Sequence, residues 1–268
     1  PLVAQAVSSR AVTLFAPGQS DSEWLLSEHP GSQSLRQGRD CEQCHLGEEA
    51  NMGKVLAAEG AVPTRDVNIA FKHQGDDLVV TLTWQGAAED KLVAMMWGDD
   101  GNEAFRRGGC WAACHSDMPG MSRDRGQELG KYLAVSRSQQ QQIGKPPRNR
   151  SRAELEQLLA AGNFVELWEL GRSAEGVSNI RSATVRDGTH WKKATGLRGT
   201  TNFHGGRWTA SFVRPLAGTA GEKALIPGKQ YTFGIALQGA GQGAAAHWVS
   251  LPLTFSLDDR DSDFITAK

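Results

Sequence analysis

Four cysteines lie in two short clusters, and a histidine directly follows each cluster. The clusters are Cys41-Glu42-Gln43-Cys44-His45 and Cys110-Trp111-Ala112-Ala113-Cys114-His115. A C-x-x-C-H pattern is typical of a covalently attached haem, because two thiols bond to the vinyl groups of the porphyrin and the histidine binds the iron. The second cluster keeps the same order of groups with one extra residue. Since the two clusters use every cysteine of the chain, the sequence predicts two covalently bound haem c groups and a role in electron transfer.

Two other uses of the cysteines stay open from the residues alone. The four thiols would supply the ligands of one tetrahedral zinc ion, or each pair would close a small disulfide. The zinc hypothesis leaves both neighbouring histidines unexplained, and four cysteines in 268 residues are few for a fold that depends on disulfides. We therefore expect His45 and His115 to be proximal iron ligands.

The composition limits the classes of partner and the cell compartment. The formal net charge is −1, with acidic and basic residues mixed, which indicates no nucleic-acid or anionic-membrane partner. No stretch approaches 18 consecutive apolar residues, so we expect no membrane span. The chain begins without methionine, as a mature form would after loss of a signal peptide. Because thioether attachment takes place outside the bacterial cytoplasm, we expect a periplasmic protein.

The residue pattern changes near residue 63. Residues 1–62 are irregular and are expected to form a small N-terminal segment that binds the first haem. Residues 63–268 alternate between apolar and polar side chains, with an interruption at about 99–162 that holds the second cluster and ends in a capping box, Ser151-x-x-Glu154, before a helix of about ten residues. The expected strands cover 67–73, 78–84, 91–97, 163–170, 181–186, 207–214, 230–238 and 246–256. The predicted fold is mainly β, an antiparallel β-sandwich with a haem-bearing insertion.

Several stretches resemble the haem-binding ethylbenzene-dehydrogenase gamma-subunit-like family. They are residues 109–121, Leu167-Trp168, residues 207–216 and residues 247–253. The stretch 23–31, which leads to the first cluster, is similar to the two-haem c-type members. The resemblance implies a β-sandwich with haem close to the sheets. It also implies a periplasmic electron carrier, which in some relatives is a subunit of a molybdenum oxidoreductase of the dimethyl-sulfoxide-reductase type.

The chain departs from the gamma subunits at the cofactor. Those proteins hold a non-covalent haem between methionine and lysine, whereas the thiols here indicate covalent attachment, and the place of the lysine matches His247. The chain is expected to act either as a free-standing carrier or together with a redox partner. That partner would be a molybdenum oxidoreductase or a membrane quinol-oxidising cytochrome. The alternative function is a haem enzyme, or a protein that binds peroxide, nitric oxide or carbon monoxide at one five-coordinate iron.

His247 is the first candidate for the distal ligand of the second haem. It falls on the apolar face of the strand expected at 246–256, where an imidazole needs a partner. A core histidine that is hydrogen-bonded to the backbone would give the same pattern. Met118 and Met121 are the other candidates, because they follow His115 closely, and packing against the porphyrin edge is their other interpretation.

His29 and His73 compete for the distal position of the first haem. His29 lies 12 residues before Cys41 in the same irregular segment, so a loop would bring it over the haem. His73 shares the apolar face of the strand expected at 67–73 but lies at its end. Met52 is a third candidate, with a role as a hydrophobic haem contact as its other interpretation. Two histidine ligands on each iron would leave both closed to substrate, which favours an electron carrier over an enzyme.

Arginines and tryptophans surround the second cluster. Arg106, Arg107, Arg123 and Arg125 either pair with haem propionates or an acidic partner, or are solvated loop charges. Trp97 and Trp111 are expected to wall the haem pocket.

Overall fold

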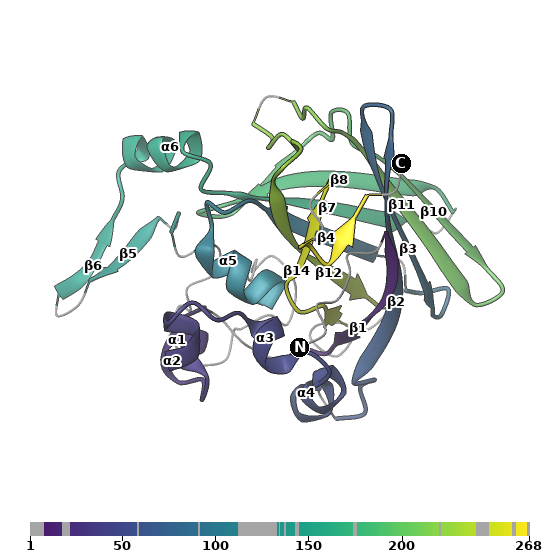
Figure 1. Ribbon diagram of the computed structural model, residues 1–268, viewed down its shortest axis with the longest axis horizontal. Coiled ribbons are helices and arrows are strands. Elements are labelled where there is room, and N and C mark those ends of the chain that lie inside the picture. Colours follow the sequence, from purple (N-terminus) through teal and green to yellow (C-terminus); the bar gives the residue numbers. More distant parts are fainter. Residues whose placement is uncertain are drawn as a thin grey trace.

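Strands are the most abundant secondary structure of the computed structural model, in which 13 strands join one curled sheet (Figure 1). The structure describes residues 8–17, 22–57, 59–90, 92–111, 133, 135–136, 138–142, 145–173, 176–219, 221–239, 247–258 and 261–266. The strands of the large sheet are β1 (Ser9–Phe15), β2 (Thr64–Gln74), β3 (Asp77–Gln85), β4 (Leu92–Gly98), β7 (Val165–Arg172), β8 (Ser178–Val185), β9 (Thr189–Lys192), β10 (Arg198–His204), β11 (Arg207–Pro215), β12 (Gln230–Gln238), β13 (His247–Val249), β14 (Leu253–Ser256) and β15 (Phe264–Ile265).

The helices of the described residues are α1 (Ser22–Ser27), α2 (Ser32–Arg36), α3 (Cys41–His45), α4 (Glu49–Leu56), α5 (Glu103–Gly108) and α6 (Arg152–Ala160). A 3₁₀ turn, Gly109–Trp111, continues from α5. None of the helices in these ranges is long and apolar enough to cross a membrane.

The sheet curls until its two ends meet. Its order is β10-β11-β3-β2-β1-β13-β12-β4-β7-β8-β9, and neighbouring strands along this path are antiparallel. The Ser178 hydroxyl of β8 lies 3.0 Å from the Thr201 hydroxyl of β10, although these strands stand near opposite ends of the strand order. A side chain on Gly199 of β10 would collide with Ile180 and Leu170, so the two ends pack closely. The mainly-β, antiparallel prediction is confirmed, although one continuous curled sheet takes the place of two separate sheets.

Alternate side chains of the strands fill the interior of the curl with aromatic and aliphatic groups. Phe71 of β2 stacks on Phe255 of β14 with ring centroids 4.9 Å apart. Trp84 and Trp208 stack at 5.8 Å, across the pairing of β3 with β11. Trp97 meets Trp168 edge to face at 5.7 Å. Trp97 therefore faces the interior, and the expectation that it walls a haem pocket around Cys110 is wrong, because Cys110 packs on the opposite face of the sheet.

The interior also encloses an ion pair. Arg214 of β11, which is 1% exposed, donates to Glu166 of β7 at 3.1 Å and lies 5.0 Å from the ring of Trp97. Burial raises the pKa of the Glu166 carboxyl, while the Arg214 charge opposes that rise. The backbone N–H of Lys223 and the indole N–H of Trp168 also donate to this carboxylate. Each of these donors offsets the desolvation of a charge inside the core.

Most strands begin and end close to their predicted positions. The hairpin of β2 and β3 and the strand β12 match the expected ranges, and α6 carries the predicted capping box between Ser151 and Glu154. The stretch 246–256 is divided, because β13 and β14 are separated by residues 250–252. Strands β1, β5, β6, β9, β10 and β15 and the helices α1 to α5 were not predicted.

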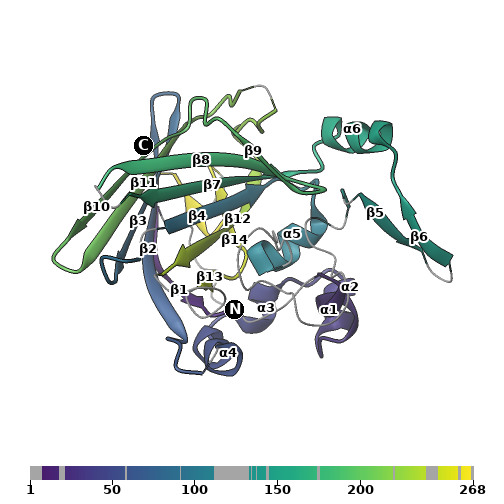
Figure 2. The ribbon, with the colours of Figure 1, turned by 180° about the vertical axis from the view of Figure 1, so that it is seen from behind.

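The outer face of the sheet carries the helices. Helices α1, α2, α3 and α5 gather on one side of the molecule, with α4 beside the start of β2 (Figures 1 and 2). Between β4 and β7, a separate hairpin of β5 (Gln139–Gln142) and β6 (Lys145–Asn149) extends away from the body together with α6. The helices α1 to α4 come between β1 and β2, so the strand β1 anchors the helical N-terminal part in the sheet.

The buried ion pair gives a test of the interior. Replacing Arg214 with methionine keeps the volume but leaves Glu166 buried without its cation, which should lower the free energy of unfolding by about 3 kcal/mol. The control is Arg198→Met, whose side chain is 65% exposed and pairs with Asp77, and it should cost less than about 1 kcal/mol. Denaturant titration measures both, and equal losses would contradict the account.

Candidate functional site

The first cysteine cluster forms a short helix of its own. Asp40 caps α3, because its carboxylate accepts a hydrogen bond from the Gln43 N–H at 2.7 Å. Within α3, Cys41 is buried and Cys44 is exposed, and both are free thiols. Positions three apart lie on one face of a helix, so both thiols point to the same side. His45 ends the helix and is half-buried.

His29 and His45 lie face to edge beside this helix. Their ring centroids are 6.0 Å apart and the rings are inclined by 64°. A bond from histidine nitrogen to a metal is about 2 Å long, so one metal between two imidazoles holds the ring centroids about 6 Å apart. The observed separation of His29 and His45 matches that requirement, whereas His73 lies elsewhere.

The charge state of His29 suits a metal ligand. Burial lowers its pKa, and the neighbouring His45 lowers it further, which favours the neutral imidazole that binds metals. The Gly31 N–H donates to His29 Nδ1 at 3.0 Å, and this bond leaves the ring proton on Nε2. Binding through Nε2 therefore requires the proton to move to Nδ1 and the bond to Gly31 to break.

The second cluster begins against the sheet. Cys110 packs over the paired residues Met96 of β4 and Gly234 of β12. A Cβ on Gly234 would lie 2.7 Å from the Cys110 sulfur, so glycine makes room for the thiol. Cys114, His115, Met118 and Met121 lie outside the described residues.

The thiols of Cys41 and Cys110 both stay protonated at neutral pH. Burial raises the pKa of Cys41 to about 12, with further increases from Asp40 and Cys44, and burial raises the pKa of Cys110 to about 12. Neutral thiols are poor nucleophiles. In the ranges that the structure describes, no three His, Cys, Asp or Glu side chains form a group that would hold a metal ion. Cys41, Cys44 and Cys110 therefore do not converge as the zinc hypothesis requires.

One apolar layer joins the two clusters. We call it the outer layer; its buried members are Phe15, Leu25, Leu35, Cys41, Val249 and Leu251. Cys110 and Met52 pack against the same outer layer. The two cysteine clusters, far apart in sequence, thus begin on one face of the sheet.

The remaining histidine candidates lie in different places. His247 is 5% exposed and belongs to β13, where it points to the same side as Val249 of the outer layer. His73 lies near the opposite end of β2 from Thr64, at roughly 30 Å for a strand of this length. Its Nε2 is buried and has no hydrogen-bond partner within the described ranges. The structure brings His29, His45, Cys41 and Met52 to the outer face of the sheet and leaves His73 apart.

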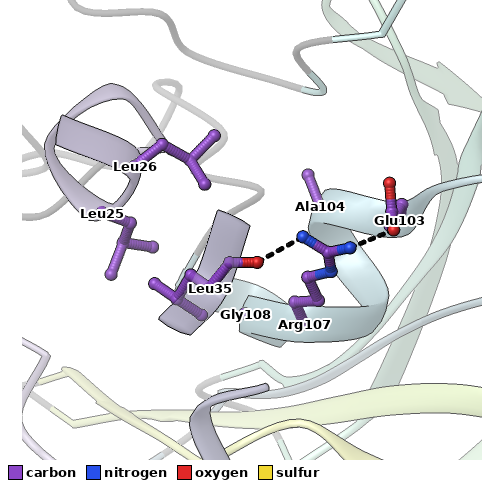
Figure 3. A pocket seen from close by; sticks show the side chains of 7 residues that line it. All are labelled: Leu25, Leu26, Leu35, Glu103, Ala104, Arg107 and Gly108. Atoms are coloured by element: carbon purple, nitrogen blue, oxygen red, sulfur yellow. Dashed lines mark hydrogen bonds and ion pairs between the residues drawn. The ribbon is translucent and has the colours of Figure 1, made fainter. Parts of the chain in front are cut away.

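A crevice separates α1 and α2, which precede the first cluster, from α5, which precedes the second. Leu25 and Leu26 of α1 and Leu35 of α2 face α5 across a cavity of about 110 Å³ (Figure 3). Arg107 of α5 donates to the Leu35 carbonyl and pairs with Glu103. Its Nε is buried without a hydrogen-bond partner in the described structure. Arg107 is therefore a tie between helices rather than a solvated loop charge.

The sequence did not predict that Glu42 of α3 would pair with a second carboxylate, Asp263. Glu42, between the two cysteines, lies against Asp263 near the C-terminus, and Arg10 of β1 contacts both, at 3.8 Å from Glu42 and 3.0 Å from Asp263. Burial raises the pKa of Glu42 to about 8, and the charge of Asp263 adds to the rise while Arg10 opposes it. These residues come from three distant segments, so no local pattern could have indicated them.

The Glu42 carboxyl predicts a pH dependence of stability. Its pKa rises from 4.5 to about 8 on folding, so its contribution is complete below pH 4.5 and is lost as the pH rises through about 8. Glu42→Gln stays neutral, so the variant should gain about 1 kcal/mol or more relative to the wild type between pH 5 and pH 9. Urea titrations at both pH values measure it, with exposed Glu48→Gln as the control. A pH-independent difference would contradict the prediction.

Two curated proteins are similar to this chain over nearly its full length. Cytochrome c-552 of Stutzerimonas stutzeri is 27% identical over 290 aligned residues, which cover 98% of this chain and 89% of that protein. Cytochrome c-551 of Rhodocyclus tenuis is 23% identical, covering 98% of this chain and 97% of that protein. No family model matches the chain.

Among solved structures, a putative carbohydrate-binding protein from Bacteroides uniformis ATCC 8492 aligns with 73% of this chain and 72% of its own, at 8% identity and a TM-score of 0.38. That likeness is too low to carry an argument. The similarity in sequence points instead to the c-type cytochromes, and it includes both cysteine clusters in its span.

Proposed function

We propose that this chain is a di-haem c-type cytochrome that transfers electrons in the periplasm. The observation that carries the proposal is the arrangement at α3, where two thiols share a helix face and His29 stands 6.0 Å from His45. The similarity to two proteins named as c-type cytochromes over 98% of the chain supports the same cofactor and role.

The first haem would be attached to Cys41 and Cys44, with His45 and His29 as its axial ligands. Cys41 reaches into the outer layer, so the attached edge of the porphyrin would be covered while exposed Cys44 marks an edge open to a partner. Met52 packs on the outer layer and would be a hydrophobic contact. His73 would be too distant to bind this iron.

The second haem would be attached to Cys110 and Cys114, with His115 as its proximal ligand. His247 would be the distal ligand, because it is buried on the same face of the sheet as Cys110 and the outer layer. Met118 and Met121 remain the alternatives. Gly234 would leave the room that the Cys110 thioether occupies.

The haem iron supplies reversible one-electron exchange between its ferric and ferrous states. The chain's own residues would bind and orient the haem. His29 stays neutral because burial and His45 lower its pKa, so binding through Nε2 would require only that its ring proton move to Nδ1 and the bond from Gly31 break. Four imidazole ligands would keep both irons six-coordinate and closed to substrates, which favours electron transfer over catalysis. Two histidines also favour lower potentials than a histidine and a methionine.

The partners would be redox proteins. A molybdenum oxidoreductase and a membrane quinol-oxidising cytochrome are the two classes that we propose, and a free-standing carrier between such proteins is compatible with both. Because the side chains of Cys44 and Leu46 are exposed, the accessible edge of the first haem would lie at the surface, where a partner would dock.

The haem count tests the proposal. The denatured protein should retain both haems, each adding roughly 0.6 kDa to the mass of the chain. Replacing Cys41 and Cys44 with alanine should remove one of them, and replacing Cys110 and Cys114 should remove the other. Intact-mass spectrometry measures the loss. A colourless native protein, or one haem in the wild type, would overturn the proposal.

The ligand assignment has its own test. The reduced wild type should not change its spectrum with carbon monoxide, because both irons are six-coordinate. His29→Ala should open the first iron and His247→Ala the second, each giving a high-spin ferric signal and a carbon monoxide adduct at about one site per chain. His73→Ala is the matched control and should behave as the wild type. A shift for His73→Ala, or none for His29→Ala, would reverse the assignment.

A further inference from the structure

Resting on the function above, we propose that the two haems lie side by side over the outer layer of the sheet and act as a coupled pair. The structure brings Cys41, Cys110 and His247 to this face, and His29 stands 6.0 Å from His45 at the end of α3. The inference concerns how the two haems stand relative to each other, which the haem count alone does not address.

The strand register gives an estimate of the distance between the two haem attachment sites. One row of paired residues crosses the sheet through Phe15 of β1, Val249 of β13 and Ala236 of β12. Adjacent strands lie about 4.8 Å apart, so Phe15 and Ala236 are roughly 10 Å apart on the same face. These are the positions against which the two clusters pack.

Each cluster occupies one end of that row. Cys41 packs with Phe15 and Val249 in the outer layer. Cys110 packs over Gly234, which lies two residues along β12 from Ala236, or about 7 Å. The attachment points are therefore separated by roughly 10–15 Å. A porphyrin spans much of that distance, so two porphyrins tethered on one face would come close to each other.

The helices that lead into the two clusters also contact each other. Helix α3 contacts α5 directly. Arg107 of α5 donates to the Leu35 carbonyl of α2, and its guanidinium lies close to Gly38, which precedes Cys41 by three residues. The segment that leads into the second cluster is thus fastened to the segment that leads into the first. Arg107 fixes the spacing of the two attachment sites.

The apolar surroundings would strengthen the electrostatic coupling between the two haems. The outer layer consists of apolar side chains, and charges interact over longer distances in such surroundings than in water. An electron on one iron would therefore shift the potential of the other. The pair would fill in two separated steps even if the two irons had equal intrinsic potentials.

Circular dichroism across the Soret band tests the pairing in the intact holo-protein. Two equal transitions held close together give a couplet, with two lobes of opposite sign that cross near the absorption maximum. Isolated haems give a band of one sign. The oxidised protein should show the couplet. At one electron per chain the two Soret energies differ, so the couplet should fall by more than half.

Variants separate this inference from the proposed function. Cys110→Ala with Cys114→Ala leaves one haem and should abolish the couplet, while His73→Ala keeps both haems and should retain it. Should the double variant fail to fold, the half-reduced wild type decides the matter. Two haems by mass with a band of one sign would overturn the pairing and leave the proposed function standing. One haem by mass would overturn both.

Discussion

The packing of Cys41 into the outer layer is the contact on which the site depends. Phe15 and Val249, paired between β1 and β13, form the apolar surface that receives this cysteine, and Leu25 and Leu35 cover it from the helices. The helices α1 to α4 depend on packing of this kind, because each is too short to be stable alone. The sheet therefore positions both His29 and α3, and through them the pair of imidazoles.

The two faces of the sheet have separate roles. The interior holds the aromatic core and the buried pair of Arg214 with Glu166, which gives the curl a fixed shape. The outer face carries Cys41, Cys110 and His247, and Glu42 of α3 contacts Arg10, which also pairs with Asp263.

The sequence predicts the strands and the attachment motifs well because both depend on short spacings. The alternation of β2, β3 and β12 and the capping box at Ser151 are local signals, and each is found in the structure. The same period-two rule places His247 beside Val249, yet it could not tell which apolar face is the interior. For that reason Trp97 was expected at the haem and lies in the core instead. The meeting of Glu42, Asp263 and Arg10, and the tie from Arg107 to Leu35, join segments that only the folded chain brings together.

The central claim is that two covalently held haems each lie between two histidines on one face of a curled sheet. Low-temperature electron paramagnetic resonance of the oxidised protein tests it most directly, because it counts ferric centres and separates their ligand classes. The account predicts two low-spin centres per chain, both with the signature of paired imidazoles. A single centre, a high-spin majority, or a methionine-ligated spectrum would contradict it.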